Sequence, residues 1–285
     1  MIPQSFEYTA PATRGQALDL VGGAGVKVLA GGMSLVPLMK LRLAAPLHLV
    51  DLGRIPELRY IREDGNQIRI GAMTTHYEIE SSPLLRAKCQ LLAETAAHIG
   101  DVQVRILGTI GGSVVHADPA ADYPAALCAL EAQVRLEGKG GERTLGIGDF
   151  LLDVFTTAIE PGEVLTEVIV PVEEAGTAVS YQKMVHPASG FAVVGAAARL
   201  RRSNGKLDWV RVGITGLGPK GFRALVVEER LSGSAVDTDA IRRATAAAAA
   251  GIDANSDVYA SGEYRKQMVA VYAARAIAAA LERTR

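Results

Sequence analysis

Hydrophobic and polar positions near the start of the chain predict a strand, a glycine turn and a short helix. The apolar run at residues 26–30 ends at Gly31-Gly32, and apolar residues then recur at helical spacing over residues 35–43. Pro46 stops this helical pattern, because proline lacks the N–H group that a helix interior requires. Residues 48–52 alternate like a second buried strand.

The next stretch predicts a two-stranded ribbon and a helix. Apolar runs at residues 58–61 and 67–70 flank Asp64-Gly65, a pair that is typical of a hairpin turn. Apolar residues then fall at helical spacing from 83 to 98, and Gly100 lies where a helix C-cap glycine belongs. We therefore expect one helix over residues 83–98.

The centre of the chain changes from small residues to apolar segments and then to a break. Residues 109–122 are rich in glycine, alanine and aspartate, and we expect a loop there that leads into a helix at 123–130. Strand-like runs follow near Thr144 and from 163 to 170. The segment 171–176 (PVEEAG) interrupts this pattern and is the best candidate for a linker between two domains.

The last third of the chain predicts an antiparallel meander followed by helices. Three strand-like runs, separated by turn residues, cover residues 179–185, 191–200 and 209–216. Helical patterns follow at residues 222–231, 238–250 and 262–283. Strands and helices therefore segregate along the chain, which is typical of an α+β fold.

Composition and charge exclude several classes of protein. With 285 residues, of which 49% are hydrophobic, the chain has enough apolar material for one large or two moderate domains. A formal net charge of -1 gives no field that attracts nucleic acid, and no stretch approaches the ~18 uninterrupted apolar residues of a membrane span. We expect a cytoplasmic protein. Its two cysteines, Cys89 and Cys128, cannot supply the four thiolates of an iron–sulfur cluster.

Two glycine-rich turns are candidates for holding an anion. Ala30-Gly31-Gly32-Met33-Ser34-Leu35 lies between a predicted strand and a predicted helix, where the backbone can curl with several N–H groups pointing inward. Such a turn fits a phosphate, but a tight turn without a ligand explains it equally well. Thr109-Ile110-Gly111-Gly112-Ser113 repeats the same chemistry, and two converging loops would enclose the two phosphates of a dinucleotide.

Two further motifs allow weaker hypotheses. His116, Asp118 and Asp122 are close in sequence, but one histidine and two carboxylates are too few donors for a convincing metal site. We expect Asp122 to cap the helix that follows it or to accept hydrogen bonds from a ribose. Residues 216–221 match G-x-G-x-x-G, but no further strands of a parallel sheet follow, so a nicotinamide site is not expected there.

These motifs, in this order, closely resemble the FAD-binding medium subunit of the molybdenum hydroxylases, a family that includes carbon monoxide dehydrogenase and the xanthine dehydrogenases. The resemblance rests on residues 27–40 (KVLAGGMSLVPLMK), 109–113 (TIGGS) and 117–122 (ADPAAD). Residues 181–184 (YQKM) and 191–194 (FAVV) extend it into the last third, so it spans nearly the whole chain.

The resemblance implies a two-domain fold and an assembly. Residues 1–173 would form a FAD-binding domain of the vanillyl-alcohol-oxidase (PCMH) type, with two α/β subdomains that divide near residue 55. Residues 176–285 would combine a three-stranded antiparallel sheet with a helical bundle. The implied partners are a large molybdopterin subunit and a small subunit with [2Fe–2S] clusters, in a heterotrimer or a dimer of heterotrimers. This chain would pass electrons from the clusters through FAD to an external acceptor.

The resemblance also implies cofactor-binding residues, whereas it implies no catalytic or metal-binding residue. In the order of the chain, they are Leu29, Ala30, Gly31, Gly32, Met33, Ser34, Leu35, Thr109, Ile110, Gly111, Gly112, Ser113, Ala117, Asp118, Asp122, Leu165, Lys183 and Phe191. The two glycine loops would clasp the pyrophosphate. Near the isoalloxazine, Phe191 would cover one face of the flavin, and Lys183 would favour negative charge on the reduced ring.

Several positions depart from the pattern that is common in the family. Ile106-Leu107 replaces a more polar pair, Ser113 stands where asparagine is frequent, His186 where arginine is frequent and Gly190 where aspartate is frequent. We expect these changes to alter the tuning of the flavin or the choice of acceptor rather than FAD binding. Two other hypotheses stay open: a self-sufficient flavin-dependent oxidoreductase and an interaction subunit that has lost its cofactor.

Overall fold

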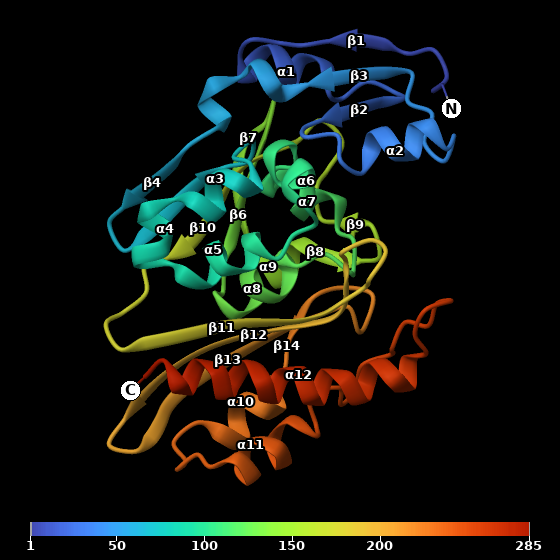
Figure 1. The fold of residues 1–285 in the computed structure, drawn as a ribbon. Helices are drawn as coiled ribbons and strands as arrows, with labels where there is room; N and C mark the ends of the chain where they lie inside the picture. The colour runs from blue at the N-terminus through green and yellow to red at the C-terminus, as the bar shows by residue number, and fades with distance from the viewer. Residues whose placement is uncertain (1, 285) are drawn as a thin grey trace.

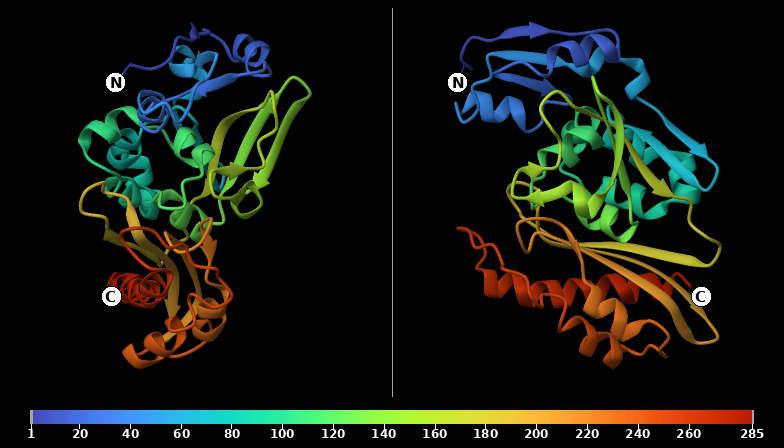
Figure 2. Two further views of the ribbon diagram at one scale, coloured as in Figure 1. Left: turned by 90° about the vertical axis from the view of Figure 1, so that its right-hand side faces the viewer. Right: turned by 180° about the vertical axis from the view of Figure 1, so that it is seen from behind.

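The three larger sheets are stacked from the N-terminus to the C-terminus in Figure 1. The computed structural model describes residues 2–284. Figure 2 shows that the first two sheets and their helices lie on one side of the C-terminal sheet, and that the long C-terminal helix lies on its other side. None of the helices within residues 2–284 is long and apolar enough to span a membrane.

The N-terminal sheet is parallel and carries the first glycine loop. In chain order its elements are β1 (Glu7–Thr9), α1 (Arg14–Leu20), β2 (Val26–Leu29), α2 (Leu35–Lys40) and β3 (His48–Asp51), and the strand order is β1-β3-β2. The predicted strand, glycine turn and helix are confirmed, although α2 ends earlier than expected, at Lys40. The hydrophobic pattern gave no sign of β1, because all of its residues are exposed.

The middle layer is an antiparallel five-stranded sheet with helices packed on one face. Its strands, in the order β4-β5-β10-β6-β7, are β4 (Ile61–Asp64), β5 (Gln67–Gly71), β6 (Gln133–Gly138), β7 (Gly141–Gly146) and β10 (Val164–Pro171). Its larger helices are α3 (His76–Ser81), α4 (Pro83–Lys88), α5 (Gln90–Ala97), α6 (Val102–Leu107), α7 (Ile110–His116) and α8 (Tyr123–Ala129). Alternate residues such as Ile68 and Ile70 are fully buried in the core cluster that the strands share with these helices.

Short elements complete the middle layer. They are two turns of 3-10 helix at Leu52–Arg54 and Pro56–Leu58, the helix α9 (Ile147–Phe150) and the two-stranded pair β8 (Leu151–Asp153) and β9 (Thr156–Thr157). The predicted hairpin is confirmed as β4 and β5, but its first strand begins at Ile61 because the preceding residues form the second 3-10 turn.

Two predictions for the middle layer are wrong. The helix expected over residues 83–98 is two helices, because the buried Cys89 takes a non-helical conformation with φ −156° and ψ 60°. The segment 109–122, expected to be a loop, contains the helix α7. Thr109 caps this helix by accepting a hydrogen bond from the Gly112 amide at 3.1 Å, which offsets the low helix propensity of its glycines.

The C-terminal layer is a meander covered by helices on its far side. Its elements are β11 (Thr177–Val185), β12 (Ala192–Ser203), β13 (Lys206–Thr215), β14 (Phe222–Arg223), α10 (Leu225–Leu231), α11 (Thr238–Thr245) and α12 (Gly262–Glu282). The three predicted strands and the last helix are confirmed. The helix expected from residue 222 is wrong at its start, because β14 pairs with β13 and adds a fourth strand. The helix expected over 238–250 ends at Thr245, and the residues after it form turns.

The core is continuous across the predicted linker. Residues 172–176 join β10 to β11, as expected. Yet Val179 and Tyr181 of β11 belong to the same buried cluster as the middle layer, while the opposite face of the sheet packs against α10, α11 and α12. The two predicted domains therefore share one core cluster, and their division at residues 173 and 176 stays a prediction.

Candidate functional site

The structure brings the two glycine loops together. A Cβ atom placed on Gly31 would lie 2.1 Å from the Leu107 carbonyl oxygen and 2.7 Å from the Cα atom of Gly108. A Cβ atom on Gly112 would lie 3.4 Å from the Cβ atom of Ala30. The loop after β2 thus touches the joint between α6 and α7, and Figure 1 shows these elements facing each other between the first two sheets.

Unpaired polar groups gather in the first loop. Within residues 2–284, the amides of residues 31–34 donate to no backbone or side-chain acceptor, and the Ser34 hydroxyl makes no capping bond. The first backbone bond of α2 runs from the Val36 amide to the Gly32 carbonyl at 3.0 Å, and Gly32 takes a left-handed φ of 72°. A curled backbone with four successive free N–H groups fits a pyrophosphate better than it fits a self-contained turn.

The second glycine loop differs from the first in the groups that it offers to a ligand. The amides of Ile110 and Gly111 are already used, since Ile110 donates to the Thr74 carbonyl at 3.0 Å and Gly111 donates to the Ala72 carbonyl at 2.9 Å. The amide of Gly112 donates to Thr109, as described above. These amides are therefore not free as those of the first loop are, and the contact of this loop with a pyrophosphate stays a prediction. The second loop packs against the first loop. It also offers the Ser113 hydroxyl, for which the structure gives no protein partner within residues 2–284.

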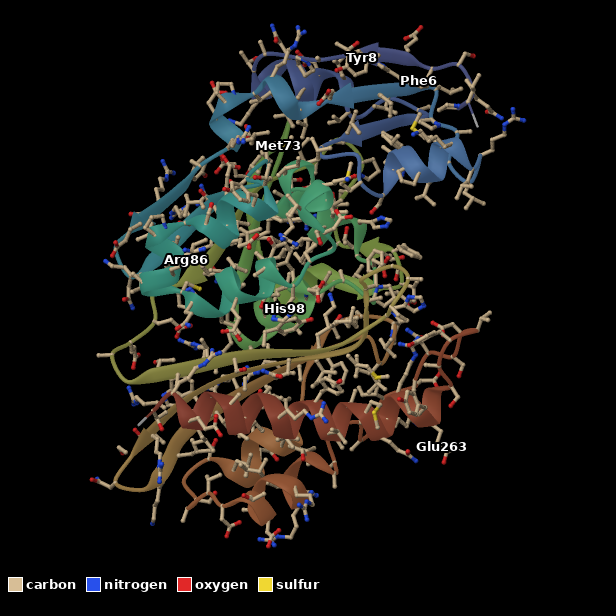
Figure 3. All side chains as sticks on the ribbon, in the orientation of Figure 1. Phe6, Tyr8, Met73, Arg86, His98 and Glu263 are labelled. Carbon is tan, nitrogen blue, oxygen red and sulfur yellow. The ribbon has the colours of Figure 1, made fainter. Side chains whose placement is uncertain are left out.

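Asp122 and Lys183 form a buried ion pair between the middle and C-terminal layers. Lys183 Nζ donates to Asp122 Oδ2 at 3.0 Å and to the His98 carbonyl at 2.8 Å, and the Tyr181 hydroxyl donates to Asp122 Oδ1 at 2.6 Å. The side chain of Lys183 is 1% exposed and that of Asp122 is 4% exposed. Figure 3 labels His98 beside β11, at the lower edge of the middle layer.

The hydrogen bonds of Asp122 correct one prediction. Burial raises the pKa of Asp122, and the charge and hydrogen bond of Lys183 oppose that rise. The carboxylate of Asp122 makes no capping bond to α8, so its expected role as a helix cap is wrong. Both of its oxygens accept from protein donors, and its contact with a ribose and the contact of Lys183 with the flavin stay predictions.

The remaining predicted residues fall into two groups. Ala117 ends α7 with a left-handed φ of 51°, and Asp118 Oδ1 accepts from the Ala120 amide at 2.8 Å in the loop that follows. Leu165 is only 3% exposed and belongs to the core, whereas Phe191 is 42% exposed and immediately precedes β12. The structure therefore places the first two beside the second glycine loop, and Leu165 shares one buried cluster with Ile110 of that loop. Residues 2–284 contain no group of three metal-ligating side chains.

Sequence reasoning missed His76 and Tyr123, which lie directly beneath the second glycine loop. His76 Nδ1 is 3.1 Å from the Tyr123 hydroxyl, and the two rings meet edge to face with centroids 5.3 Å apart. A sequence signature was present, because Thr75 and Glu78 form a capping box that marks the start of α3. Nothing in the local sequence relates His76 to Tyr123, which is 47 residues away.

We expect a pH dependence of stability that depends on His76. Burial, reinforced by Arg105, lowers the pKa of His76 to about 4 from 6.5. Between these values the unfolded chain binds a proton that the folded chain does not, so the free energy of unfolding falls as the pH drops from about 6.5 to 4, by on the order of 3 kcal/mol. Urea unfolding of the parent and of His76→Gln at pH 4.5 and pH 7 measures this. Equal losses of stability in both proteins would contradict it.

Two family profiles match this chain. A family profile described as FAD binding domain in molybdopterin dehydrogenase matches residues 4–173, and one described as CO dehydrogenase flavoprotein C-terminal domain matches residues 179–280. The carbon monoxide dehydrogenase medium chain of Hydrogenophaga pseudoflava is 41% identical over 285 residues, which cover 99% of each chain. That of Afipia carboxidovorans is 39% identical over 287 residues, with full coverage of both chains.

Solved structures agree in fold. A carbon monoxide dehydrogenase structure from Hydrogenophaga pseudoflava contains a chain with a TM-score of 0.96 and 42% identity, and the match covers 99% of each chain. Quinoline 2-oxidoreductase from Pseudomonas putida 86 gives a TM-score of 0.95 at 28% identity, over 100% of this chain and 99% of that one.

The fold and the two family profiles define the chain as a flavoprotein subunit, and it belongs to the family of FAD-binding subunits of molybdenum hydroxylases. Within that family it is a medium subunit of the carbon monoxide dehydrogenase type, which makes it an oxidoreductase subunit with FAD as its cofactor. The predicted fold class, family and cofactor are thereby confirmed.

Proposed function

We propose that this chain holds FAD between its two glycine loops and passes electrons from [2Fe–2S] clusters of a partner subunit through FAD to an external acceptor. The observation that carries the proposal is the run of free amides at residues 31–34, at the place where Gly31 meets Leu107 and Gly108. These amides and the Ser34 hydroxyl donate to the pyrophosphate, and the second loop closes the site. FAD supplies the reversible uptake and release of electrons, so no residue of this chain need act as an acid or a base.

The cysteines support a relay from another chain. Cys89 and Cys128 are both buried, and burial raises the pKa of each thiol, that of Cys128 to about 12. Neither is available as a thiolate ligand, and residues 2–284 hold no cluster of metal-ligating side chains. Iron–sulfur clusters therefore belong on a partner. We propose a small [2Fe–2S] subunit and a large molybdopterin subunit, in a heterotrimer or a dimer of heterotrimers.

The substrate of the complex is set by another subunit. Relatives of this chain bear the names glyceraldehyde dehydrogenase medium chain, at 34% identity, and nicotine 6-hydroxylase medium subunit, at 31% identity. Flavin subunits similar to this chain thus bear the names of different oxidations, and we expect the native complex to contain molybdenum and iron together with FAD. Metal analysis of the complex isolated through this chain tests the assembly. A chain that purifies with FAD alone and oxidises its own substrate would support the self-sufficient oxidoreductase instead.

We expect Ser34→Ala to weaken FAD binding without preventing it. The hydroxyl is one donor among several, and a hydrogen bond to a charged acceptor contributes about 1.5 kcal/mol, so the Kd for FAD should rise roughly tenfold. Fluorescence titration of the deflavinated protein with FAD measures the Kd. Ser234→Ala is the matched control, because Ser234 Oγ donates to the Leu231 carbonyl at 2.7 Å in the C-terminal layer. An unchanged Kd in Ser34→Ala would remove Ser34 from the site.

A further inference from the structure

His76 occupies a buried position at the base of the proposed FAD site. It is 4% exposed, and its backbone amide donates to the Gly108 carbonyl at 3.0 Å. Its ring packs against the same residue, since a Cβ atom on Gly108 would lie 2.7 Å from His76 Nε2. One residue of α3 therefore contacts the joint between α6 and α7 through both its backbone and its side chain.

The contacts of His76 extend through Gly108 to the first glycine loop. Gly108 lies against Gly31 as well as against His76, because its Cα atom would lie 2.7 Å from a Cβ atom on Gly31. Beneath His76, the Tyr123 hydroxyl holds Nδ1 of the ring. These contacts form a stack of four residues: Tyr123, His76, Gly108 and Gly31. The stack runs from α8 to the loop after β2 and joins segments that are distant in the sequence.

Backbone pairing reinforces the lower half of this stack. The Ile110 and Gly111 amides donate to carbonyls of the segment that precedes His76, and residues 75 and 109 form an isolated bridge. The second loop is thereby fixed to the start of α3 along its length. The upper half, between Gly108 and Gly31, is held by packing alone, because the amide of Gly31 donates to no acceptor within residues 2–284.

We propose that His76, oriented by Tyr123, is a positioning residue for FAD: its ring supports Gly108 from below and so fixes the separation of the two glycine loops. The inference rests on the proposed location of FAD between these loops. His76 does not touch the cofactor. It acts through Gly108, and its neutral ring fills a space that a smaller side chain leaves open.

The test compares FAD binding by the full chain, or by the isolated complex if the chain alone does not retain FAD. The Kd and the rate constant for FAD dissociation are measured for the parent, His76→Ala, His76→Gln and Tyr123→Phe at a temperature at which all remain folded by circular dichroism. Thr245→Ala is the control for general destabilisation, because Thr245 is 1% exposed and its hydroxyl donates to the Ile241 carbonyl at 2.9 Å within α11.

A displaced second loop misplaces the groups that surround FAD, so His76→Ala is expected to raise the Kd by about tenfold or more. His76→Gln, which keeps a planar polar group in the same space, should lie within about threefold of the parent, and Tyr123→Phe should show an intermediate rise. Thr245→Ala should leave the Kd unchanged at a comparable loss of thermal stability. If His76→Ala does not fold, the Kd of Tyr123→Phe tests the inference, since this variant removes only the hydroxyl.

Two results would overturn the inference. One is an unchanged Kd in His76→Ala and Tyr123→Phe, and the other is a rise no larger than that of Thr245→Ala at equal stability. Failure of the proposed function has a different signature, in which replacement of Gly31 by valine leaves FAD binding intact whatever the His76 variants do.

Discussion

Replacement of Gly31 by valine is expected to abolish FAD binding and to leave the C-terminal layer folded. The Cβ atom that valine introduces would overlap backbone atoms of Leu107 and Gly108, at 2.1 and 2.7 Å, and no change of rotamer relieves a clash with backbone. The two loops must therefore separate. A separation of about 1 Å at a binding site costs on the order of a hundredfold, so FAD should be lost on desalting.

The matched control for this prediction is Gly140→Val. Gly140 has no neighbour within 4 Å of a Cβ atom and lies in the turn between β6 and β7, so the added side chain meets open space. Visible absorption after incubation with FAD and desalting measures retention in both variants, and circular dichroism checks the fold. If Gly31→Val retains FAD as the parent does, the loops do not enclose the cofactor in the way that we propose.

Replacement of Lys183 by methionine is expected to destabilise the folded chain by about 3–5 kcal/mol, because it leaves a buried carboxylate without its partner. Asp122 would keep the hydroxyl of Tyr181 and lose the ammonium group that offsets its burial. The pKa of Asp122, already raised by burial, would rise further in the variant. A raised pKa stabilises the folded state at low pH, so the loss should shrink as the pH falls from 7 through the raised pKa of Asp122 and should be smallest near pH 4, the ordinary pKa of the unfolded carboxyl.

The double variant Asp122→Asn/Lys183→Met is the control for this effect. It removes both charges and keeps a group that accepts from Tyr181, so it should recover much of the stability that the single variant loses. Urea unfolding at pH 7 and at pH 4 measures all three proteins. A single variant as stable as the parent at pH 7 would show that the ion pair contributes nothing, and a double variant as unstable as the single one would show that the uncompensated charge is not the cause.

The chemistry of the first glycine loop could be predicted from the sequence because it is local. Two glycines and a serine between a strand and a helix define a turn, and the structure shows that its amides are free. The second loop misled the same reasoning. Its glycines and alanines have weak helix propensity, and α7 forms there because Thr109 caps it and because Gly111 permits close packing on Ala72.

Contacts between distant segments could not be predicted from one sequence. Lys183 was expected to act on the flavin, but its surroundings are set by Asp122, which is 61 residues away, and by the carbonyl of His98. The approach of Gly31 to Leu107 likewise depends on how two layers dock. Spacing along the chain carries no information on such docking. The fold and the cofactor could be predicted because the ordered motifs resemble those of a known family.

Hydrogen exchange of the backbone amides, with and without FAD, tests the central claim most directly. The amides of residues 31–34 donate to no acceptor among residues 2–284, so they should exchange rapidly in the protein without cofactor and become protected when FAD is bound. The amides of Ile110 and Gly111, already bonded, should change little. Bound FAD without protection at residues 31–34 would contradict the account, because the pyrophosphate would then lie elsewhere.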